Sequence, residues 1–378
     1  MLHVHEINLQ RIAGGGEVYT RAFSRALADA GAKVTLYVRR DNAFWNGLDG
    51  PSLSLCRLRG AQDLVDALPA ERAVVLTQGP IERGVLKRIA ARHWLASFAH
   101  MPIQGGRGVD EFRDCRLVLT VSRYCIGLLR DAGIGQVYGE PMYGVADAAR
   151  GDPRAAVEAT SCYLWDHRKV RDRLLGLLEP LTKPLRPRRR FEKRSGLTLG
   201  IVSLLMPIKQ FPLLFRYLGP ILARHDANVE IFGAGGYAQV RDLKRAIEPI
   251  AARTRFWGLQ RDVAAVYPKI DYLLTGLPEK EALGLNVLES QACGTPVLAP
   301  RAPPFTETLI DGTSGFLYAD PRSDGGEDFE RVLAKIIAAP ERPNPLLAAQ
   351  HLSQFTYAAL VARAARLMRE IEQTTMRE

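Results

Sequence analysis

Residues 275–297 read TGLPEKEALGLNVLESQACGTPV. Thr275 stands at the end of an apolar run that predicts a buried strand, and Gly276 and Pro278 after it predict a loop. A short helix is expected from about residue 284 to residue 293, before a Gly-Thr-Pro turn leads into another strand. A loop that enters a helix in this way presents unpaired backbone N–H groups and the positive end of the helix dipole, which suit an anionic or hydroxyl-rich ligand.

Two glutamates stand eight residues apart in this stretch, Glu281 in the loop and Glu289 in the helix. A single glutamate near a helix start often does no more than complement the helix dipole or face the solvent. The whole string, however, resembles the signature of glycosyltransferase family 4, whose members are retaining enzymes and carry two glutamates at this spacing around a Gly-Leu step. Residues 288–297, LESQACGTPV, match that signature almost residue for residue.

The resemblance implies an α/β fold of the GT-B type, in which two Rossmann-like domains, each a doubly wound parallel sheet, face a cleft. Length and composition agree with two domains, because 378 residues with 47% hydrophobic content can bury two ordinary cores. We expect one domain at 1–147, a basic linker or insertion at 148–194, a nucleotide-sugar domain at 195–354, and a C-terminal helix at 355–378 that crosses back to the first domain.

Composition also predicts the compartment. No apolar run approaches the ~20 residues that cross a bilayer, and residues 1–6 lack the basic head and apolar stretch of a secretory signal. The five cysteines are scattered without a Cys-x-x-Cys pair, as is typical of a reduced compartment. We therefore expect a cytoplasmic protein that can also lie peripherally on the inner face of the membrane.

The first domain is predicted from alternating strands and helices. A strand at 4–7, a glycine loop at 14–16, a helix from residue 17 with Gly31 as its C-terminal cap, and a strand at 34–38 open the series. Further strands are expected at 73–77, 95–99 and 117–121, the last followed by Ser122 as a helix N-cap. Such alternation with short loops indicates a parallel, doubly wound sheet.

The glycine loop allows three interpretations. Gly14 and Gly16 give half of a dinucleotide fingerprint, but Tyr19 stands where the third glycine belongs; with two arginines after the second strand, an NADP-dependent oxidoreductase stays open. A tight turn without a ligand is the plainest interpretation. The resemblance implies a third, in which Gly15 and Gly16 approach the phosphates of the donor.

His100 follows the strand at 95–99. Ligands of open parallel sheets bind beyond the carboxyl ends of the strands, so a polar side chain there is well placed to meet a substrate, although many such histidines are only loop residues. The resemblance implies that His100 contacts the donor sugar. Asn8 and Ser122, at other strand ends, are weaker candidates of the same kind.

Excess positive charge gathers in one segment. The chain carries a net charge of +10, and residues 166–194 hold 11 Lys and Arg against 4 Asp and Glu. Leucines are interspersed with these cations, and such a basic amphipathic stretch suits an anionic membrane surface and a lipid-linked acceptor. A solvated linker is the alternative. Nucleic-acid binding is not expected, since no aromatic interleaving or recognised module accompanies the arginines.

The second domain begins with an apolar strand at 197–204 and a loop that carries Lys209. By resemblance Lys209 holds the donor diphosphate, and Gly233 lies in a glycine turn near the nucleotide base. A short helix is expected at 262–267, and the resemblance implies that the loop before it contacts the base. The family usually has an arginine five residues before this lysine, where this chain has Leu204. Arg261 or Arg301 could replace that arginine, or the chain could be a weak or inactive homologue that acts as a binding protein.

The expected chemistry is metal-independent transfer of a sugar from a nucleoside diphosphate sugar. The chain has no Asp-x-Asp sequence and no metal-ligand spacing of histidine and cysteine, so no cofactor is predicted and Lys209 and helix N-termini meet the diphosphate charge. Backbone N–H groups of Leu283, Gly284 and Leu285 would bind the sugar or phosphate. Glu281 would accept hydrogen bonds from sugar hydroxyls, and Glu289 from the ribose.

The resemblance implies a hexosyltransferase-like enzyme that retains the anomeric configuration. Its donor would be a UDP- or GDP-sugar and its acceptor a glycan or lipid-linked glycan. A role in polysaccharide biosynthesis is an expectation at the level of the family only.

Overall fold

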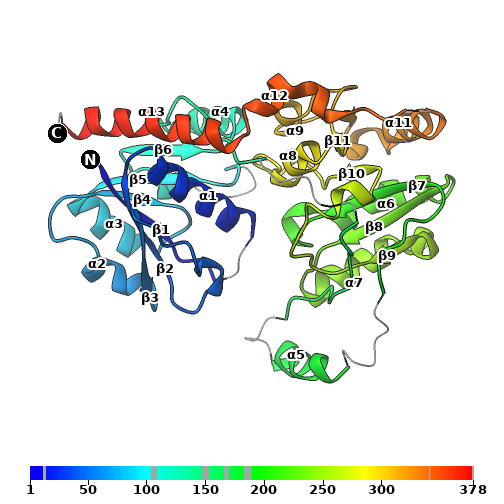
Figure 1. Cartoon of the computed structure of the whole chain (residues 1–378), viewed down its shortest axis with the longest axis horizontal. Coiled ribbons are helices and arrows are strands. Elements are labelled where there is room, and N and C mark those ends of the chain that lie inside the picture. Colours follow the sequence, from blue (N-terminus) through cyan, green and yellow to red (C-terminus); the bar gives the residue numbers. More distant parts are fainter. Residues whose placement is uncertain are drawn as a thin grey trace. The chain divides into compact units, whose positions relative to one another are not determined.

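The computed structural model describes residues 1–11, 14–103, 109–146, 152, 154–165, 170–182, 189–339 and 341–376. The chain forms two compact units, residues 1–147 with 353–378, and residues 148–352 (Figure 1). Each unit has its own six-stranded sheet, in which every neighbouring pair of strands is parallel. The prediction of two Rossmann-like α/β domains is therefore confirmed.

The first unit orders its strands β3-β2-β1-β4-β5-β6. Their bounds are β1 His3–Asn8, β2 Lys33–Arg39, β3 Leu53–Leu58, β4 Val74–Thr77, β5 Trp94–Ala99 and β6 Leu117–Thr120. Strand β3 was not predicted. It lies at the sheet edge with only its end residues Leu53 and Leu58 buried, so it lacks the continuous apolar run that marks a strand covered on both faces.

The helices of the first unit begin and end largely where their caps predict. They are α1 Gly15–Asp29, α2 Leu64–Ala67, α3 Arg83–Arg92, α4 Arg123–Asp131 and α13 Tyr357–Thr375, with 3₁₀ turns η1 Ala43–Trp45, η2 Ala61–Asp63 and η3 Val109–Glu111. Gly31 follows α1 with φ +99°, the left-handed conformation expected after a helix end. The Ser122 side chain accepts a hydrogen bond from the Cys125 N–H at 3.2 Å, which confirms it as the N-cap of α4.

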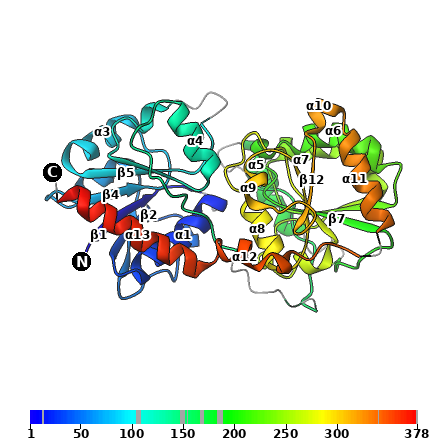
Figure 2. The same cartoon turned by 90° about the horizontal axis from the view of Figure 1, so that it is seen from above.

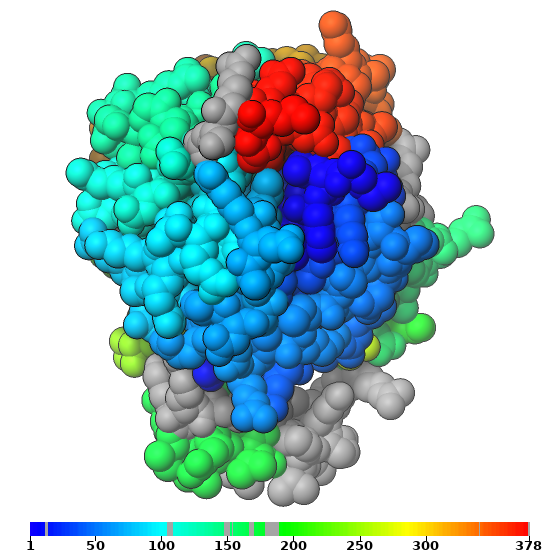
Figure 3. Space-filling model, turned by 90° about the vertical axis from the view of Figure 1, so that its left-hand side faces the viewer, coloured from blue at the N-terminus to red at the C-terminus, as the bar shows by residue number. Residues whose placement is uncertain are grey.

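Helix α13 belongs to the first unit although it is last in sequence. It lies beside α1 in both views (Figures 1 and 2), with Leu360, Ala364 and Leu367 at most 1% exposed. The Tyr357 hydroxyl donates to Asp29 at 2.7 Å, at the end of α1. The end of α13 and the start of β1 meet on one face of the unit, where their red and dark blue surfaces adjoin (Figure 3).

The second unit orders its strands β12-β11-β10-β7-β8-β9. Their bounds are β7 Leu197–Val202, β8 Ala227–Phe232, β9 Thr254–Phe256, β10 Tyr272–Leu274, β11 Val297–Pro300 and β12 Gly315–Tyr318. The inner strands are buried on both faces. The apolar sequences of β10 and β11 predict this burial, whereas β8 also buries Asn228 and Glu230. The chain runs outward from β7 to β9 and then returns to β10, on the other side of β7.

The helices of this unit are α5 Val170–Thr182, α6 Phe211–Leu222, α7 Tyr237–Ala246, α8 Leu285–Ala292, α9 Phe305–Thr308, α10 Pro321–Asp324, α11 Glu327–Ala338 and α12 Ala349–Ser353, with 3₁₀ turns η5 Pro207–Lys209, η6 Glu248–Arg253, η7 Tyr267–Lys269 and η8 Pro345–Ala348. The short helix predicted at 262–267 is wrong. Residues 264–266 form a turn and η7 only begins at Tyr267. Asp262 accepts a hydrogen bond from the Ala265 N–H at 3.3 Å, as the N-cap of a helix does, but the turn that follows is not continued as an α-helix.

The basic segment is more than a solvated linker, because its described ends pack on the second unit. Residues 158 and 190 form an antiparallel bridge, and residues 163 and 235 a parallel one. The Phe191 ring lies 5.7 Å from that of Phe232 and 5.3 Å from that of Trp257. Residues 166–169 and 183–188 of the segment lie outside the described part of the chain. Among the described residues, no helix combines the length and the apolar character of a membrane span.

Candidate functional site

The order of strands in the second unit determines where a ligand can bind. In an open parallel sheet, the crevice lies beyond the carboxyl ends of the two strands at which the chain reverses direction across the sheet. Here those strands are β7 and β10, which are direct neighbours. Lys209 follows β7 and Glu281 follows β10, so the topology brings two residues that are 72 positions apart to one sheet edge.

Lys209 and Glu281 form an ion pair at this edge. Their side chains are 22% and 16% exposed, so the pair is largely withdrawn from water but still reachable. The second carboxylate oxygen of Glu281 accepts a hydrogen bond from the Gly284 N–H at 3.1 Å, at the N-cap of α8. Both oxygens of the predicted sugar-binding carboxylate therefore have partners within the protein.

The backbone of the two loops fits closely around this pair. The Leu277 N–H donates to the Lys209 carbonyl at 3.3 Å, and a Cβ atom at Gly276 would lie 2.3 Å from the same oxygen. Gln210 has φ +53° and is the one non-glycine residue with positive φ in the described part of the chain. Backbone strain of this kind is concentrated at functional sites, and here it follows directly after Lys209.

Helix α8 starts at Leu285, with Gly284 as N-cap at φ +81°. A side chain there would be strained by the backbone and would also press on Val287 and Phe305, whose atoms lie 3.2 and 3.3 Å from the position of a Cβ. The first N–H groups of a helix have no partner within it. Leu283, in the loop between Glu281 and the helix, is 3% exposed.

Glu289 lies on the partly exposed side of α8 and accepts a hydrogen bond from the Tyr267 hydroxyl at 2.9 Å. Burial raises the pKa of Glu289, and the hydrogen bond from Tyr267 opposes that rise. Tyr267 was not anticipated from the sequence. Tyr267 follows three apolar residues at 264–266, and nothing in this local sequence indicates a contact with a helix that begins 18 residues later.

Gly233 has a packing reason for being glycine. A Cβ atom there would lie 1.8 Å from the Ser203 carbonyl, so the loops after β7 and β8 could not approach each other with any other residue. The neighbouring Leu204 is partly buried in the former loop. Of the two arginines that could replace the arginine expected there, Arg301 is engaged with Asp311 at 2.6 Å and with the Leu317 carbonyl at 3.0 Å.

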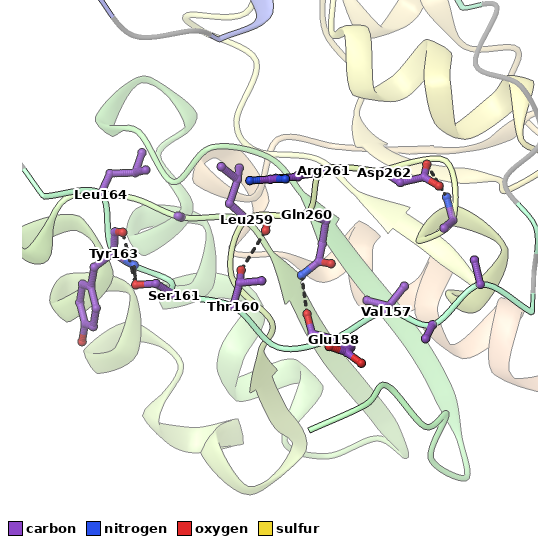
Figure 4. A pocket seen from close by; sticks show the side chains of 14 residues that line it. Val157, Glu158, Thr160, Ser161, Tyr163, Leu164, Leu259, Gln260, Arg261 and Asp262 are labelled. Atoms are coloured by element: carbon purple, nitrogen blue, oxygen red, sulfur yellow. Dashed lines mark hydrogen bonds between the residues drawn. The ribbon is translucent and has the colours of Figure 1, made fainter. Parts of the chain in front are cut away.

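Arg261 instead lines a cavity of about 560 Å³ in the second unit. The cavity lies between the loops after β8 and β9 and residues 155–164 of the basic segment, and Figure 4 shows Arg261 and Gln260 on one side with Thr160 and Glu158 on the other. Neither the cavity nor the part that residues 155–164 play in it was predicted. Its sequence has no glycine motif or charge pattern that would mark it as a wall of a site.

His100, one of the predicted residues of the first unit, belongs to a largely buried polar network. His100, after β5, contacts the Gln78 Oε1 through its Nε2 atom at 2.6 Å, and Gln78 donates to Glu6 at 2.5 Å. Glu6 is completely buried on β1 and also accepts a hydrogen bond from Ser24. Burial raises the pKa of Glu6 to about 7, against the two hydrogen bonds that lower it. Glu6 lies in a strand that also contains His3, His5 and Asn8, so its acidic side chain did not stand out in the sequence.

Gly15 and Gly16 open helix α1, after β1. The Glu17 carboxylate accepts a hydrogen bond from the Gly14 N–H at 2.8 Å. No atom lies within 4 Å of the Cβ position of Gly16, so packing does not require glycine there. An open glycine at a helix start leaves room for a ligand to approach the backbone.

Comparison with known proteins agrees with this arrangement. A model of the glycosyl transferases group 1 family matches residues 196–338. D-inositol 3-phosphate glycosyltransferase 2 of Catenulispora acidiphila is 26% identical over 400 residues, covering 93% of this chain and 89% of that protein. D-inositol 3-phosphate glycosyltransferase of an Arthrobacter species (strain FB24) is 26% identical, covering 81% and 78%.

Solved structures show the same fold at low identity. Anabaena HepE in complex with UDP and glucose superposes with a TM-score of 0.69 at 16% identity, over 98% of this chain and 100% of that chain. Sucrose-phosphate synthase of Thermosynechococcus elongatus has a TM-score of 0.70 at 16% identity, over 99% and 100%. Residues 196–338 are thus a group 1 glycosyl transferase domain, and the chain is a glycosyltransferase of the GT-B type.

Proposed function

We propose that this glycosyltransferase moves a sugar from a UDP- or GDP-sugar to a hydroxyl group of a glycan or lipid-linked glycan, with retention of configuration and without a metal ion. The observation that carries the proposal is the pair Lys209 and Glu281 at the β7–β10 crevice of the group 1 domain. Two similar solved structures are complexes with UDP and glucose and with UDP and N-acetylglucosamine, which favours a nucleoside diphosphate sugar here.

The pair suggests how donor binding begins. A diphosphate that reaches Lys209 competes with Glu281 for the ammonium group, because charge-assisted bonds to phosphate oxygens are among the strongest a lysine makes. Glu281 then loses its cation and turns to the hydroxyl groups of the sugar, which are hydrogen-bond donors. The N–H groups at the start of α8 add positive potential where the leaving diphosphate gains charge.

Glu289 and His100 have supporting roles in this proposal. Glu289 accepts hydrogen bonds from the ribose in addition to that from Tyr267, and His100, tied to Gln78, contacts the donor sugar from the first unit. Gly15 and Gly16 approach the donor phosphates. Leu204 in place of an arginine removes one cation from the diphosphate site, which favours a weaker donor affinity than a site with two cations would have.

A panel of UDP-, GDP- and ADP-sugars tests the function, with donor hydrolysis, thermal stabilisation and transfer to glycan acceptors as readouts. We expect stabilisation by at least one nucleotide, transfer that persists in EDTA, and a product whose anomeric proton coupling matches that of the donor. Stabilisation without turnover would favour an inactive homologue that acts as a binding protein. A response to NADP(H) alone would favour the oxidoreductase.

A membrane surface is part of the same proposal, through helix α5. Val170, Leu174 and Leu177 lie at helical spacing and are 65%, 55% and 67% exposed. The other side of the helix is attached to the second unit, since Arg171 lies over the Tyr237 ring at 4.4 Å. An exposed apolar stripe within a segment of 11 cations and 4 anions suits an anionic lipid surface.

A further inference from the structure

Residues 155–164, here called the arm, run along the loops that follow β8 and β9. The Gly235 N–H donates to the Cys162 carbonyl at 3.0 Å, and the Gly235 carbonyl accepts from the Leu164 N–H at 2.8 Å. On the other loop, the Thr160 N–H donates to the Trp257 carbonyl at 2.8 Å and the Thr160 hydroxyl to the Leu259 carbonyl at 2.8 Å. The arm thus pairs with both loops as an added strand would.

Gly258 shows that the arm is built into the domain. Its φ is +70°, and a Cβ atom there would lie 2.4 Å from the carbonyl oxygens of both Thr160 and Ser161. The arm can therefore pass this closely over the β9 loop only because residue 258 has no side chain. Gln260 adds a further bond, from its side-chain amide to the Glu158 carbonyl at 3.0 Å, which Figure 4 shows.

The cavity of about 560 Å³ has the arm as one wall. This volume is within the range of about 300 to 1,000 Å³ that small-molecule sites occupy. Ala234 and Ala265, 1% and 3% exposed, contribute small apolar surfaces. Glu158 and Arg261 contribute charged side chains from opposite sides (Figure 4). The cavity lies at the carboxyl ends of β8 and β9, on the edge of the sheet where its ligands are expected.

Because the arm engages the N–H and C=O groups of Gly235 and the carbonyls of Trp257 and Leu259, those backbone groups are already hydrogen-bonded before any ligand arrives. A nucleobase in this cavity would have to be distinguished by side chains instead. Arg261 offers N–H donors to carbonyl and ring-nitrogen acceptors of a base, and Glu158 offers acceptors to its N–H groups.

We propose that the arm forms one wall of the nucleoside end of the donor site and decides, together with Arg261, which base is accepted. This inference rests on the proposed function. It assigns the choice of base to a segment that lies outside the matched domain at residues 196–338.

Calorimetric dissociation constants for UDP, GDP and ADP test the role of the side chains. Arg261→Ala and Glu158→Gln are each expected to change the ratio of two of these constants by about fivefold or more, the effect of one hydrogen bond gained or lost. Arg245→Ala, which removes an exposed cation of α7 that does not line the cavity, controls for the change in net charge and should leave the ratios within about twofold.

A glycine pair tests the arm itself. Gly258→Ala is expected to push the arm away from the β9 loop. Amide hydrogen exchange at Thr160 and Leu164 should then accelerate, and the dissociation constants for UDP, GDP and ADP should become more similar. Gly312→Ala is the matched control, since Gly312 has φ +80° but no atom within 4 Å of its Cβ position; it imposes similar backbone strain without touching the arm.

The outcomes separate the two proposals. If the wild-type protein binds nucleotides and the variants at Arg261, Glu158 and Gly258 all keep its ratios, the arm does not choose the base, while the glycosyltransferase proposal stands. If the wild-type protein binds none of the three nucleotides, both proposals are overturned.

Discussion

Lys209 is the residue on which the candidate site depends most directly. Its ammonium group forms an ion pair with Glu281 at the β7–β10 crevice. Lys209→Ala is expected to reduce transfer by more than about tenfold, which corresponds to a loss of roughly 1.4 kcal/mol of transition-state stabilisation. Steady-state kinetics with the best donor of the panel measures the effect.

Two further variants make this prediction specific. Lys335→Ala removes an exposed lysine from α11 and should leave transfer near the wild-type rate. Glu281→Ala is also expected to cost more than about tenfold, and the double variant should cost less than the product of the two single losses, because the residues act as a pair. Near-normal turnover of Lys209→Ala would refute the site assignment.

Glu6 makes stability depend on pH. Its pKa rises from an ordinary value of 4.5 to about 7 through burial, so between these values the folded protein holds a proton that the unfolded chain releases. The stabilisation is complete below about pH 4.5 and is lost as the pH rises through 7. With about 1.4 kcal/mol per pKa unit, the expected decrease in unfolding free energy is roughly 3 kcal/mol.

Urea denaturation at a series of pH values measures this slope. Glu6→Gln keeps the size of the side chain but cannot titrate, so its unfolding free energy should vary less between pH 5 and 7 than that of the wild type. A variant with an unchanged slope would show that Glu6 is not the group responsible.

The sequence predicted which single residues belong to the candidate site but not which residues they contact. The motif at 275–297 predicted Glu281 and Glu289, but their spacing along the chain carries no information on partners. The contact of Glu281 with Lys209 arises because β10 is paired with β7, and that pairing is a property of the whole sheet. The link from His100 through Gln78 to Glu6 likewise needs β1, β4 and β5 to be placed side by side.

At the scale of single elements, the proposed binding of α5 to a membrane surface can be tested directly. Leu174→Glu combined with Leu177→Glu is expected to reduce co-sedimentation with vesicles of phosphatidylcholine and phosphatidylglycerol by more than about fivefold, because each buried apolar side chain is worth about 1.5 to 3 kcal/mol. Leu347→Glu is the matched control, as Leu347 is 78% exposed and lies outside α5.

The cations of the segment are tested separately. Arg189→Ser with Arg190→Ser should weaken binding to anionic vesicles while leaving the weak binding to pure phosphatidylcholine unchanged. Equal binding of the wild-type protein to anionic and neutral vesicles, or none to either, would remove the membrane surface from the proposal.

Strands that are buried on both faces were predicted from the sequence, whereas a strand at the sheet edge was not. The near-continuous apolar run of β7 predicted a strand, whereas β3 at the sheet edge has mixed burial and was missed. The arm could not be predicted either. Its bonds to Gly235 and Trp257 join residues about 70 to 100 positions apart, and its own sequence is neither a regular strand nor a helix.

At the scale of the whole molecule, the two units have separate sheets and separate apolar cores. Ending the chain after residue 353 removes α13, and with it the burial of Leu360, Leu367 and Ile371, which are 1%, 1% and 4% exposed. At about 1.5 to 3 kcal/mol for each side chain, the loss is comparable to the stability of a domain. We expect the first unit to unfold in this variant while the second unit stays folded.

Differential scanning calorimetry with and without a bound nucleotide measures this effect. The truncated protein should retain one transition that the nucleotide shifts upward, since ligands stabilise the folded form that binds them. Loss of both transitions would mean that the second unit cannot fold without the first.

The position of α13 in the first unit also bears on the order of folding during synthesis. Residues 148–352 are contiguous, and all of them have left the ribosome before residues 357–375 appear. The first unit, which needs those last residues, must wait with the surface of α1 that α13 covers exposed to solvent. Domains usually complete their folding from the N-terminus onward; in this chain the second unit is the first that can be finished, and the first 147 residues are the ones exposed to chaperones and proteases for longest.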